Sequence, residues 1–185
     1  MKENPRIKTE RLLLRPFELS DANDIQRLAG DKAIADTTLN IPHPYEDGMA
    51  EEWISTHRPK FEAGELVNFA IVSKVSNELM GAIGLIIVPQ FERAELGYWI
   101  GRPYLKNGYC TEASKAVLHY SFNTMKLNRI YAFHLSRNPS SGRVMQKIGM
   151  THEGRAPQHT KKWNKFEDLE QYGILKEAFE KRMVG

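Results

Sequence analysis

Apolar residues cluster or alternate in six segments of the chain, which predict β-strands. In residues 79–88 the run is almost continuous, as expected for a strand buried on both faces. The polar turn Ser76-Asn77-Glu78 separates this segment from the apolar segment before it, so the two are expected to pair. The six predicted strands cover residues 7–17, 66–72, 79–88, 94–100, 129–135 and 165–175.

Other segments repeat their apolar residues every three or four positions, which predicts helices. Ser20 is the expected N-cap of the first and Gly30 its end, while Pro59 should kink or shorten the second. The predicted helices cover residues 22–29, 49–61, 111–122, 139–148 and 176–182. Strands dominate early and alternate with helices late, so we expect a mixed α/β (α+β) fold around one sheet, as a single domain over residues 1–185.

Composition narrows the function classes. The 185 residues are 41% hydrophobic and 26% charged, with a net charge of +3, too small a basic excess to predict nucleic-acid binding. Cys110 is the only cysteine, and the six histidines lack metal-site spacing, so neither a disulfide framework nor a metal is expected. Residues 1–20 contain no apolar core of a signal peptide, and the uncharged run 80–88 is too short to span a membrane. We therefore expect a cytoplasmic protein.

The segment from Glu95 to Met150 carries the chemistry. A strand with two glycines, Gly97 and Gly101, precedes a loop at 105–111 that turns into a helix. Interior strand glycines often mark a bulge or a close approach by a ligand. A helix N-terminus after a Gly-containing loop presents unpaired N–H groups to an anion. The loop could equally be an ordinary strand–helix connection, and it is neither a P-loop nor a dinucleotide fingerprint.

Six motifs in this order resemble the GNAT N-acetyltransferases, in particular the RimJ/RimL-like branch. The opening Thr9–Arg15 segment and the late Glu167-Asp168 pair match the same branch, so the resemblance spans most of the chain. The six motifs are Glu95-Leu-Gly-Tyr-Trp-Ile-Gly, Gly108-Tyr-Cys-Thr-Glu-Ala, Asn128-Arg-Ile, Asn138-Pro-Ser-Ser, Lys147-Ile-Gly-Met and Glu153-Gly.

The resemblance implies a GNAT-type fold, with a splayed, mostly antiparallel sheet flanked by helices, and acetyl-CoA as the acetyl donor. It places the pantetheine arm on the backbone of Trp99 and Ile100, after a bulge, and near Asn138. The pyrophosphate falls on the amides of the loop that consists of Leu105, Lys106, Asn107, Gly108, Tyr109, Cys110 and Thr111. Leu105, Lys106 and Cys110 depart from the family pattern, but none of these changes removes a backbone donor.

Two residues are candidates for acid–base roles. Glu95 matches the strand glutamate that acts as base in histone-acetylating members; alternatively it is a surface carboxylate paired with Arg93 or Lys106. The family's usual acidic tyrosine falls on Met145, which cannot donate a proton, so Ser141 or bound water is expected to assist the leaving thiolate. Ser141 could instead serve only in the first turn of its helix, which Asn138 would cap. Cys110 is expected to be a small buried residue rather than a nucleophile.

The acceptor is an amine: a protein N-terminal α-amine, ribosomal or otherwise, or a small molecule. His43 and Tyr45 lie in a loop that borders the acceptor site in RimJ/RimL-like proteins, so they are candidate acceptor contacts. We expect direct acetyl transfer in a ternary complex, in a monomer or homodimer without membrane or nucleic-acid partners. A non-catalytic acyl-CoA sensor is the alternative, and a basic ribosome-associated module is a third. The basic loop 161–165 is expected to be a solvated turn.

Overall fold

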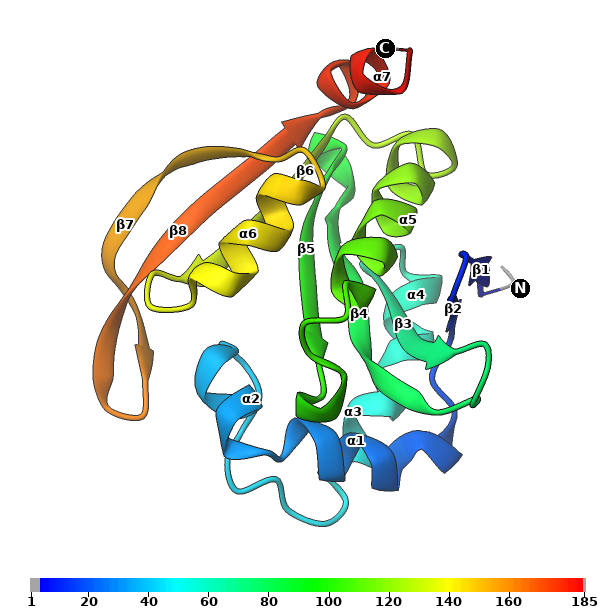
Figure 1. Cartoon of the computed structure of the whole chain (residues 1–185), viewed down its shortest axis with the longest axis vertical. Helices are drawn as coiled ribbons and strands as arrows, with labels where there is room; N and C mark the ends of the chain where they lie inside the picture. The colour runs from blue at the N-terminus through cyan, green and yellow to red at the C-terminus, as the bar shows by residue number, and fades with distance from the viewer. Residues whose placement is uncertain (1–3, 185) are drawn as a thin grey trace.

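The structure is a computed structural model that describes residues 4–184, and it is built on one eight-stranded sheet (Figure 1). The strand order is β1-β2-β3-β4-β5-β6-β8-β7. The bounds are Ile7–Lys8 for β1, Leu12–Arg15 for β2, Leu66–Ser73 for β3, Leu79–Val88 for β4, Arg93–Ile100 for β5, Arg129–Leu135 for β6, Thr151–Lys162 for β7 and Lys165–Leu175 for β8. The mixed α/β fold expected from the sequence is confirmed.

The sheet divides at its centre. Neighbouring strands are antiparallel except β5 and β6, which run parallel and pair only from Arg93 to Glu95 on the β5 side. Beyond Glu95 the two strands separate, and Figure 1 shows β6, β8 and β7 leaving the rest of the sheet at this point. A parallel pair needs a long crossover, which here contains α5. The separation leaves the last five residues of β5 with one unpaired edge.

Helices cover both faces of the sheet. The structure has α1 (Ala22–Ala29), α2 (Lys32–Thr37), α3 (Met49–Ser55), α4 (His57–Glu62), α5 (Tyr109–Asn123), α6 (Pro139–Lys147) and α7 (Lys176–Val184). The larger core cluster lies between the sheet and α5 and α6, with Phe69, Phe122 and Ile130 fully buried. A smaller cluster joins α1 and α3 to the opposite face, at Ala70 and Val72 of β3.

The predicted elements are found with three local differences. The 7–17 segment forms two strands, because the chain turns at Thr9 and pairs β1 with β2. The 49–61 helix divides at Thr56, and Pro59 lies in the first turn of α4, where its missing N–H costs no hydrogen bond. Asp21, rather than Ser20, precedes α1, after a short 3-10 turn at Leu19–Asp21.

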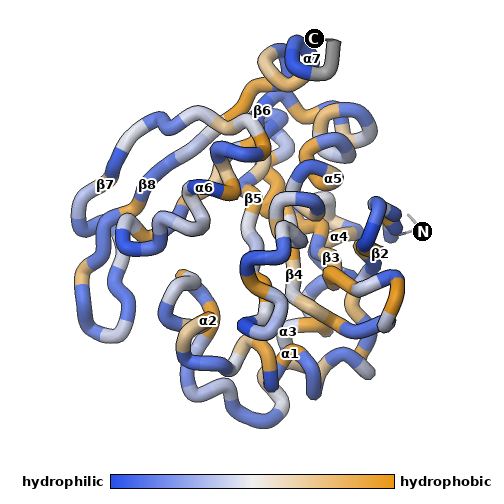
Figure 2. The backbone as a smooth tube through the Cα atoms, in the orientation of Figure 1, coloured by the Kyte–Doolittle hydropathy of each residue, from blue (hydrophilic) through white to orange (hydrophobic). Residues whose placement is uncertain are grey.

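Two elements escaped the sequence analysis. α2 has only six residues, too few to show helical periodicity. β7 has an almost entirely polar sequence with Gly154 and Pro157, and its pairing with β8 is irregular at both places. Figure 2 shows β7 as a mainly hydrophilic tube beside the more apolar central strands. β7 is a strand because β8 supplies the hydrogen-bonding partner, so its own pattern carries little signal.

Candidate active site

The point where β5 leaves β6 organises the candidate site. On the side of β4, the register runs without a shift from Val88↔Arg93 to Gly81↔Ile100, so the bulge expected in this strand is absent. Instead, Gly81 on β4 lets β5 approach closely, because any side chain there would overlap the Trp99 carbonyl oxygen. Gly81 therefore allows β4 and β5 to pack closely at Trp99.

The alternation of backbone hydrogen bonds along β5 shows which of its backbone groups face the opening between β5 and β6. Gly101 N–H donates to the Met80 carbonyl on β4, at 2.8 Å, and on the other side Asn128 N–H donates to the Glu92 carbonyl, at 2.7 Å. Because alternate residues of a strand direct their backbone groups to opposite neighbours, the even-numbered residues face β6. Past the separation these are Leu96, Tyr98 and Ile100. Trp99 directs its backbone toward β4 and its side chain toward the smaller core cluster.

The 105–111 loop presents a row of amides at the start of α5. Lys106 (φ 65°) and Gly108 (φ 80°) both adopt left-handed backbone conformations, which turn the chain into the helix. Within residues 4–184, none of the six backbone N–H groups from Lys106 to Thr111 donates a hydrogen bond. A cluster of unsatisfied N–H groups at the positive end of a fifteen-residue helix is suited to bind an anion such as a pyrophosphate.

Arg11 holds this loop in place, a role that the sequence pattern does not indicate. Arg11 Nη1 donates to the Asn107 carbonyl, at 3.0 Å, and its guanidinium lies 4.6 Å from the centre of the Tyr109 ring. Arg11 Nε and Thr9 Oγ1 donate to the carboxylate of Glu112, at 2.7 and 2.6 Å. Burial alone would raise the pKa of Glu112, but these hydrogen bonds outweigh it and lower the pKa. The opening Thr9–Arg15 motif and the helix motif therefore belong to one ion-pair network.

Glu95 lies at the last paired position of β5, opposite Tyr131 of β6. Its side chain is half-buried, and burial raises its pKa. Neither alternative partner, Arg93 or Lys106, forms a salt bridge with it among the residues that the structure describes. A half-buried carboxylate with a raised pKa is a suitable proton acceptor for an amine.

Ser141 has a partner that was not anticipated. Tyr98 reaches across the opening from β5, and its hydroxyl lies 2.9 Å from Ser141 Oγ and 3.0 Å from the Ser141 carbonyl oxygen. Burial raises the pKa of Tyr98, so its hydroxyl stays neutral and acts as a hydrogen-bond donor. Met145, at the family's tyrosine position, is 1% exposed and belongs to the core. The tyrosine at this site is therefore Tyr98 of β5, and α6 supplies the hydroxyl of Ser141.

The remaining predicted residues have contacts of their own within the fold. Asn138 precedes α6, but its side chain caps nothing and instead donates to the Thr37 carbonyl of α2, at 3.4 Å. His43 Nδ1 lies 3.1 Å from the Gly30 carbonyl oxygen, and Tyr45 packs against the smaller core cluster, as Trp99 does. Burial raises the pKa of Cys110 to about 12, which keeps the thiol protonated at neutral pH.

The β7–β8 hairpin contacts the loop after α2, and α2 itself through Arg137, which its sequence pattern does not indicate. Its turn is Trp163-Asn164, as expected, but the preceding Lys162 is 7% exposed rather than solvated. Lys162 Nζ donates to the Ile41 carbonyl at 2.8 Å, and Arg137 bridges Asp36 of α2 and Glu167 of β8. These contacts attach α2 and the loop after it to the hairpin. Burial lowers the pKa of Lys162.

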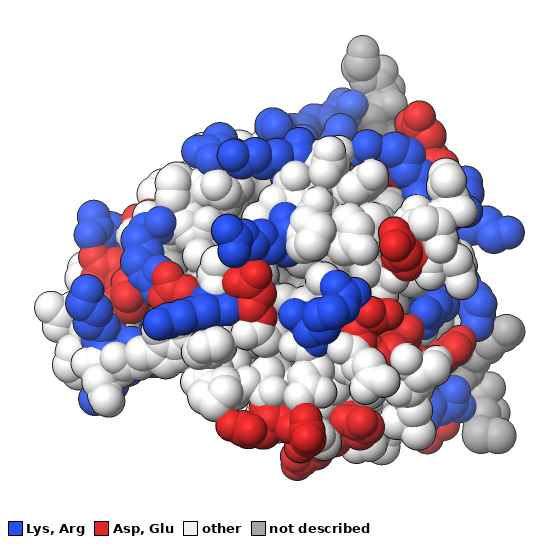
Figure 3. Space-filling view, turned by 60° about the horizontal axis from the view of Figure 1, so that its bottom comes forward, with Lys and Arg blue, Asp and Glu red and all other residues white. Residues whose placement is uncertain are grey.

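Charges of both signs are spread over one face of the molecule. On the face shown in Figure 3, Lys and Arg line the upper margin, Asp and Glu gather at the lower margin, and both signs mix between them. Among the described residues, no helix is both long and apolar enough to cross a membrane.

Comparison with known proteins shows similarity to one family along most of the chain. The model of the acetyltransferase (GNAT) domain matches residues 11–151. The uncharacterized N-acetyltransferase YnaD of Bacillus subtilis is 32% identical over 94% of this chain and 98% of its own length. The structure of a GNAT-family acetyltransferase from Bacillus anthracis superposes with a TM-score of 0.82, at 31% identity, over 94% of this chain and 99% of that one. The [ribosomal protein uS5]-alanine N-acetyltransferase of Escherichia coli is 27% identical over 50% of this chain and 49% of its own length.

Proposed function

The chain belongs to the acetyltransferase (GNAT) family and is an acetyl-CoA-dependent N-acetyltransferase, and we propose that it transfers the acetyl group to a primary amine in a ternary complex. The proposal rests on the six backbone N–H groups from Lys106 to Thr111, which donate no hydrogen bond within residues 4–184. They follow the part of β5 whose edge has no partner strand in the same residues. The first feature suits the pyrophosphate of the donor, and the second suits an extended pantetheine arm.

The donor would be held mainly by backbone groups. We assign the pyrophosphate to the amides of Lys106, Asn107, Gly108, Tyr109, Cys110 and Thr111, with Leu105 at the entry of the loop and Asn138 beside the arm. The even-numbered residues Tyr98 and Ile100 would pair with the pantetheine amides, and Trp99 would support them through its side chain. Backbone donors need little reorganisation, so they would also polarise the thioester carbonyl.

Proton transfer is assigned to side chains on the two faces of β5. Glu95 would take the proton from the attacking amine, directly or through water, because burial raises its pKa toward that of a useful base. When the C–S bond breaks, the Ser141 hydroxyl would donate a hydrogen bond to the leaving sulfur. Tyr98 would hold that hydroxyl, because its own O–H lies within hydrogen-bond distance.

The acceptor is proposed at the level of a primary amine, with His43 and Tyr45 near its entrance. One full-length relative is uncharacterized, and the E. coli relative named for a ribosomal protein alanine matches only half of each chain. A protein N-terminal α-amine and a small-molecule amine are therefore both candidates. The cytoplasm, where acetyl-CoA is abundant, is the proposed compartment.

An amine panel tests the proposal. Purified protein would be incubated with acetyl-CoA and peptide N-termini, amino acid amides and alkyl amines, with release of free CoA recorded by a thiol-reactive dye. Acceptor-dependent CoA release is expected. Tight acetyl-CoA binding in calorimetry without release across the panel would favour a non-catalytic acyl-CoA sensor, and absence of CoA binding would contradict both.

A further inference from the structure

A row of three residues crosses the sheet on the face that carries Glu95. Asn68 of β3 pairs with Gly84 of β4, and Gly84 pairs with Gly97 of β5. Directly paired residues project to the same face of a sheet, and residues two apart along a strand share that face. Asn68, Gly84, Gly97, Glu95 and Trp99 therefore face one side. At about 4.8 Å between strands, Asn68 lies about 10 Å from Gly97 across the row.

The two glycines of this row have different surroundings. A Cβ atom on Gly84 would overlap the side-chain oxygen of Asn68, so the Asn68 amide lies over Gly84. A Cβ atom on Gly97 would meet nothing within 4 Å, so the space above Gly97 is open. This open space has the Asn68 amide on one side and Glu95 and Trp99 along the strand.

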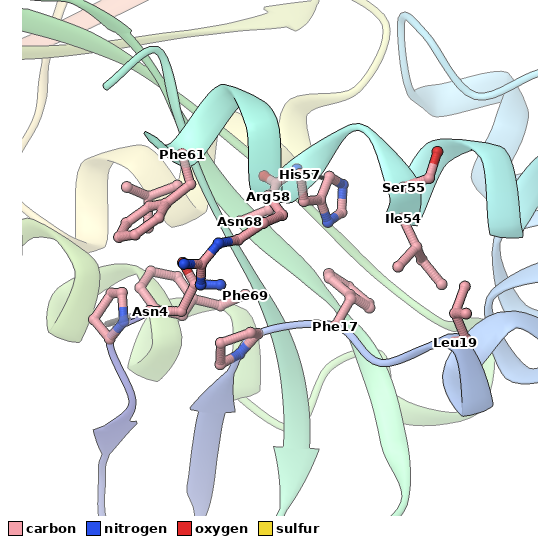
Figure 4. A pocket seen from close by; sticks show the side chains of 13 residues that line it. Asn4, Phe17, Leu19, Ile54, Ser55, His57, Arg58, Phe61, Asn68 and Phe69 are labelled. Carbon is pink, nitrogen blue, oxygen red and sulfur yellow. Dashed lines mark hydrogen bonds between the residues drawn. The ribbon is translucent and has the colours of Figure 1, made fainter. Parts of the chain in front are cut away.

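His57 fixes the orientation of the Asn68 amide. Asn68 Nδ2 lies 3.0 Å from His57 Nε2, and Figure 4 shows both side chains at the wall of a cavity of about 260 Å³ beneath α4. Burial, with a smaller effect from Lys60, lowers the pKa of His57 to about 4, so the ring is neutral and accepts the amide N–H. With its NH2 group engaged, Asn68 Oδ1 is left over Gly84, and within residues 4–184 it has no hydrogen-bond donor.

We propose that Asn68 is an acceptor-binding residue: its Oδ1 receives an N–H of the acceptor amine above Gly97, opposite Glu95, and His57 positions it. This inference rests on the proposed acetyl transfer. Both groups that flank the open space are hydrogen-bond acceptors, which complement the N–H donors of a primary amine. A carboxylate next to the amine would meet two oxygen acceptors and be repelled. The site therefore selects amines whose neighbouring carbonyl is an amide, as in a peptide N-terminus, over free amino acids.

Alaninamide and alanine provide a matched pair of probes, because they differ in the charge beside the same amine. With wild-type protein and saturating acetyl-CoA, kcat/KM is expected to be at least tenfold higher for alaninamide. Asn68→Ala should raise the KM for alaninamide about tenfold, because one hydrogen bond to a charged group is lost, and should leave the KM for acetyl-CoA unchanged. Gly97→Ala should raise the alaninamide KM because its methyl group occupies the open space.

Asn68→Asp gives a readout that a purely structural role would not change. A second carboxylate near Glu95 would raise its pKa further, so the acidic limb of the kcat profile should move to higher pH. Asn123→Ala is the matched control, because Asn123 makes a similar bond to His119, at 3.0 Å, on the exposed side of α5. His57→Gln, which can still accept a hydrogen bond, should retain more acceptor affinity than His57→Leu.

The outcomes separate this inference from the proposed function. If wild type transfers acetyl groups but Asn68→Ala behaves like Asn123→Ala, or alanine is the better acceptor, the assignment of Asn68 is wrong. If wild type transfers nothing, calorimetry of alaninamide binding to the protein–CoA complex decides. Binding that Asn68→Ala weakens would support the amine site while refuting catalysis, and absent binding would refute the site as well.

Discussion

The proposed donor and acceptor sides of the opening are built in different ways. The donor side uses backbone amides of one continuous segment, residues 106–111, and the Arg11–Glu112 ion pair fixes that segment in place. The acceptor side would use side chains from β3, β5 and α4, with Asn68 across the sheet from the open Gly97 position and Glu95 two residues along β5 from it. A donor shared by a whole family can be bound by backbone N–H groups, which are present whatever the side chains are. The acceptor requires side chains that are specific to one protein.

This difference predicts that single substitutions affect one side at a time. The largest effect is expected on the acceptor side, from Glu95→Gln. Loss of the base should lower kcat about 100- to 1000-fold and remove the acidic limb of the pH profile, with acetyl-CoA affinity unchanged. Stopped-assay kinetics and calorimetry measure the two quantities. Glu51→Gln, at an exposed position on α3, is the control; a comparable loss of kcat there, or normal kcat in Glu95→Gln, would contradict the assignment.

On the donor side, Gly108→Val should weaken acetyl-CoA binding at least tenfold, because a branched side chain is strained at φ 80° and displaces the loop amides. Gly64→Val is a matched control, since Gly64 has φ 75° and open surroundings after α4. Both variants should lose about 1 kcal/mol or more of folding stability. Calorimetry should find weaker CoA binding only in Gly108→Val, and equal affinities in the two variants would show that the loop does not hold the donor.

The Tyr98–Ser141 pair lies between the two sides. Tyr98→Phe and Ser141→Ala are each expected to lower kcat about tenfold, because Ser141→Ala removes the hydroxyl that would donate to the leaving sulfur and Tyr98→Phe removes the hydrogen bond that holds this hydroxyl. Because Tyr98 acts through Ser141, the double variant should be no slower than Ser141→Ala alone. Multiplicative effects in this cycle would mean that the two hydroxyls work independently. Unfolding temperatures of the variants serve as the control for folding.

A separate effect, on stability, is expected at His57. Its pKa is lowered to about 4, whereas the unfolded chain binds that proton near pH 6.5. The folded protein therefore has the full contribution well above pH 6.5 and loses about 3 kcal/mol as the pH falls to 4. Urea unfolding across this range should show a shallower pH dependence in His57→Leu. His159→Gln, at an exposed position, should keep the wild-type slope; equal slopes in all three proteins would show that folding does not lower the pKa of His57.

The sequence by itself determined what depends on neighbouring residues. Apolar periodicity located all the central strands and the long α5, because burial imposes a period on each element. The loop that we propose as the anion-binding site was also visible, since a glycine and a following helix are adjacent in the chain. The family, the mixed α/β fold and acetyl-CoA dependence followed from motifs in order, and the comparisons confirm them.

Only the tertiary structure decided what depends on residues distant in sequence. Arg11 and Glu112 are 101 residues apart, and Tyr98 and Ser141 are 43 apart, so no local pattern could pair them. The row from Asn68 to Gly97 exists only because the register of β3, β4 and β5 aligns it. The polar strand β7 likewise forms because β8 offers it hydrogen bonds. Pairing across a sheet is set by the whole fold, so the sequence could suggest Glu95, His43 and Tyr45 but not the place of Asn68 in the row with Gly97.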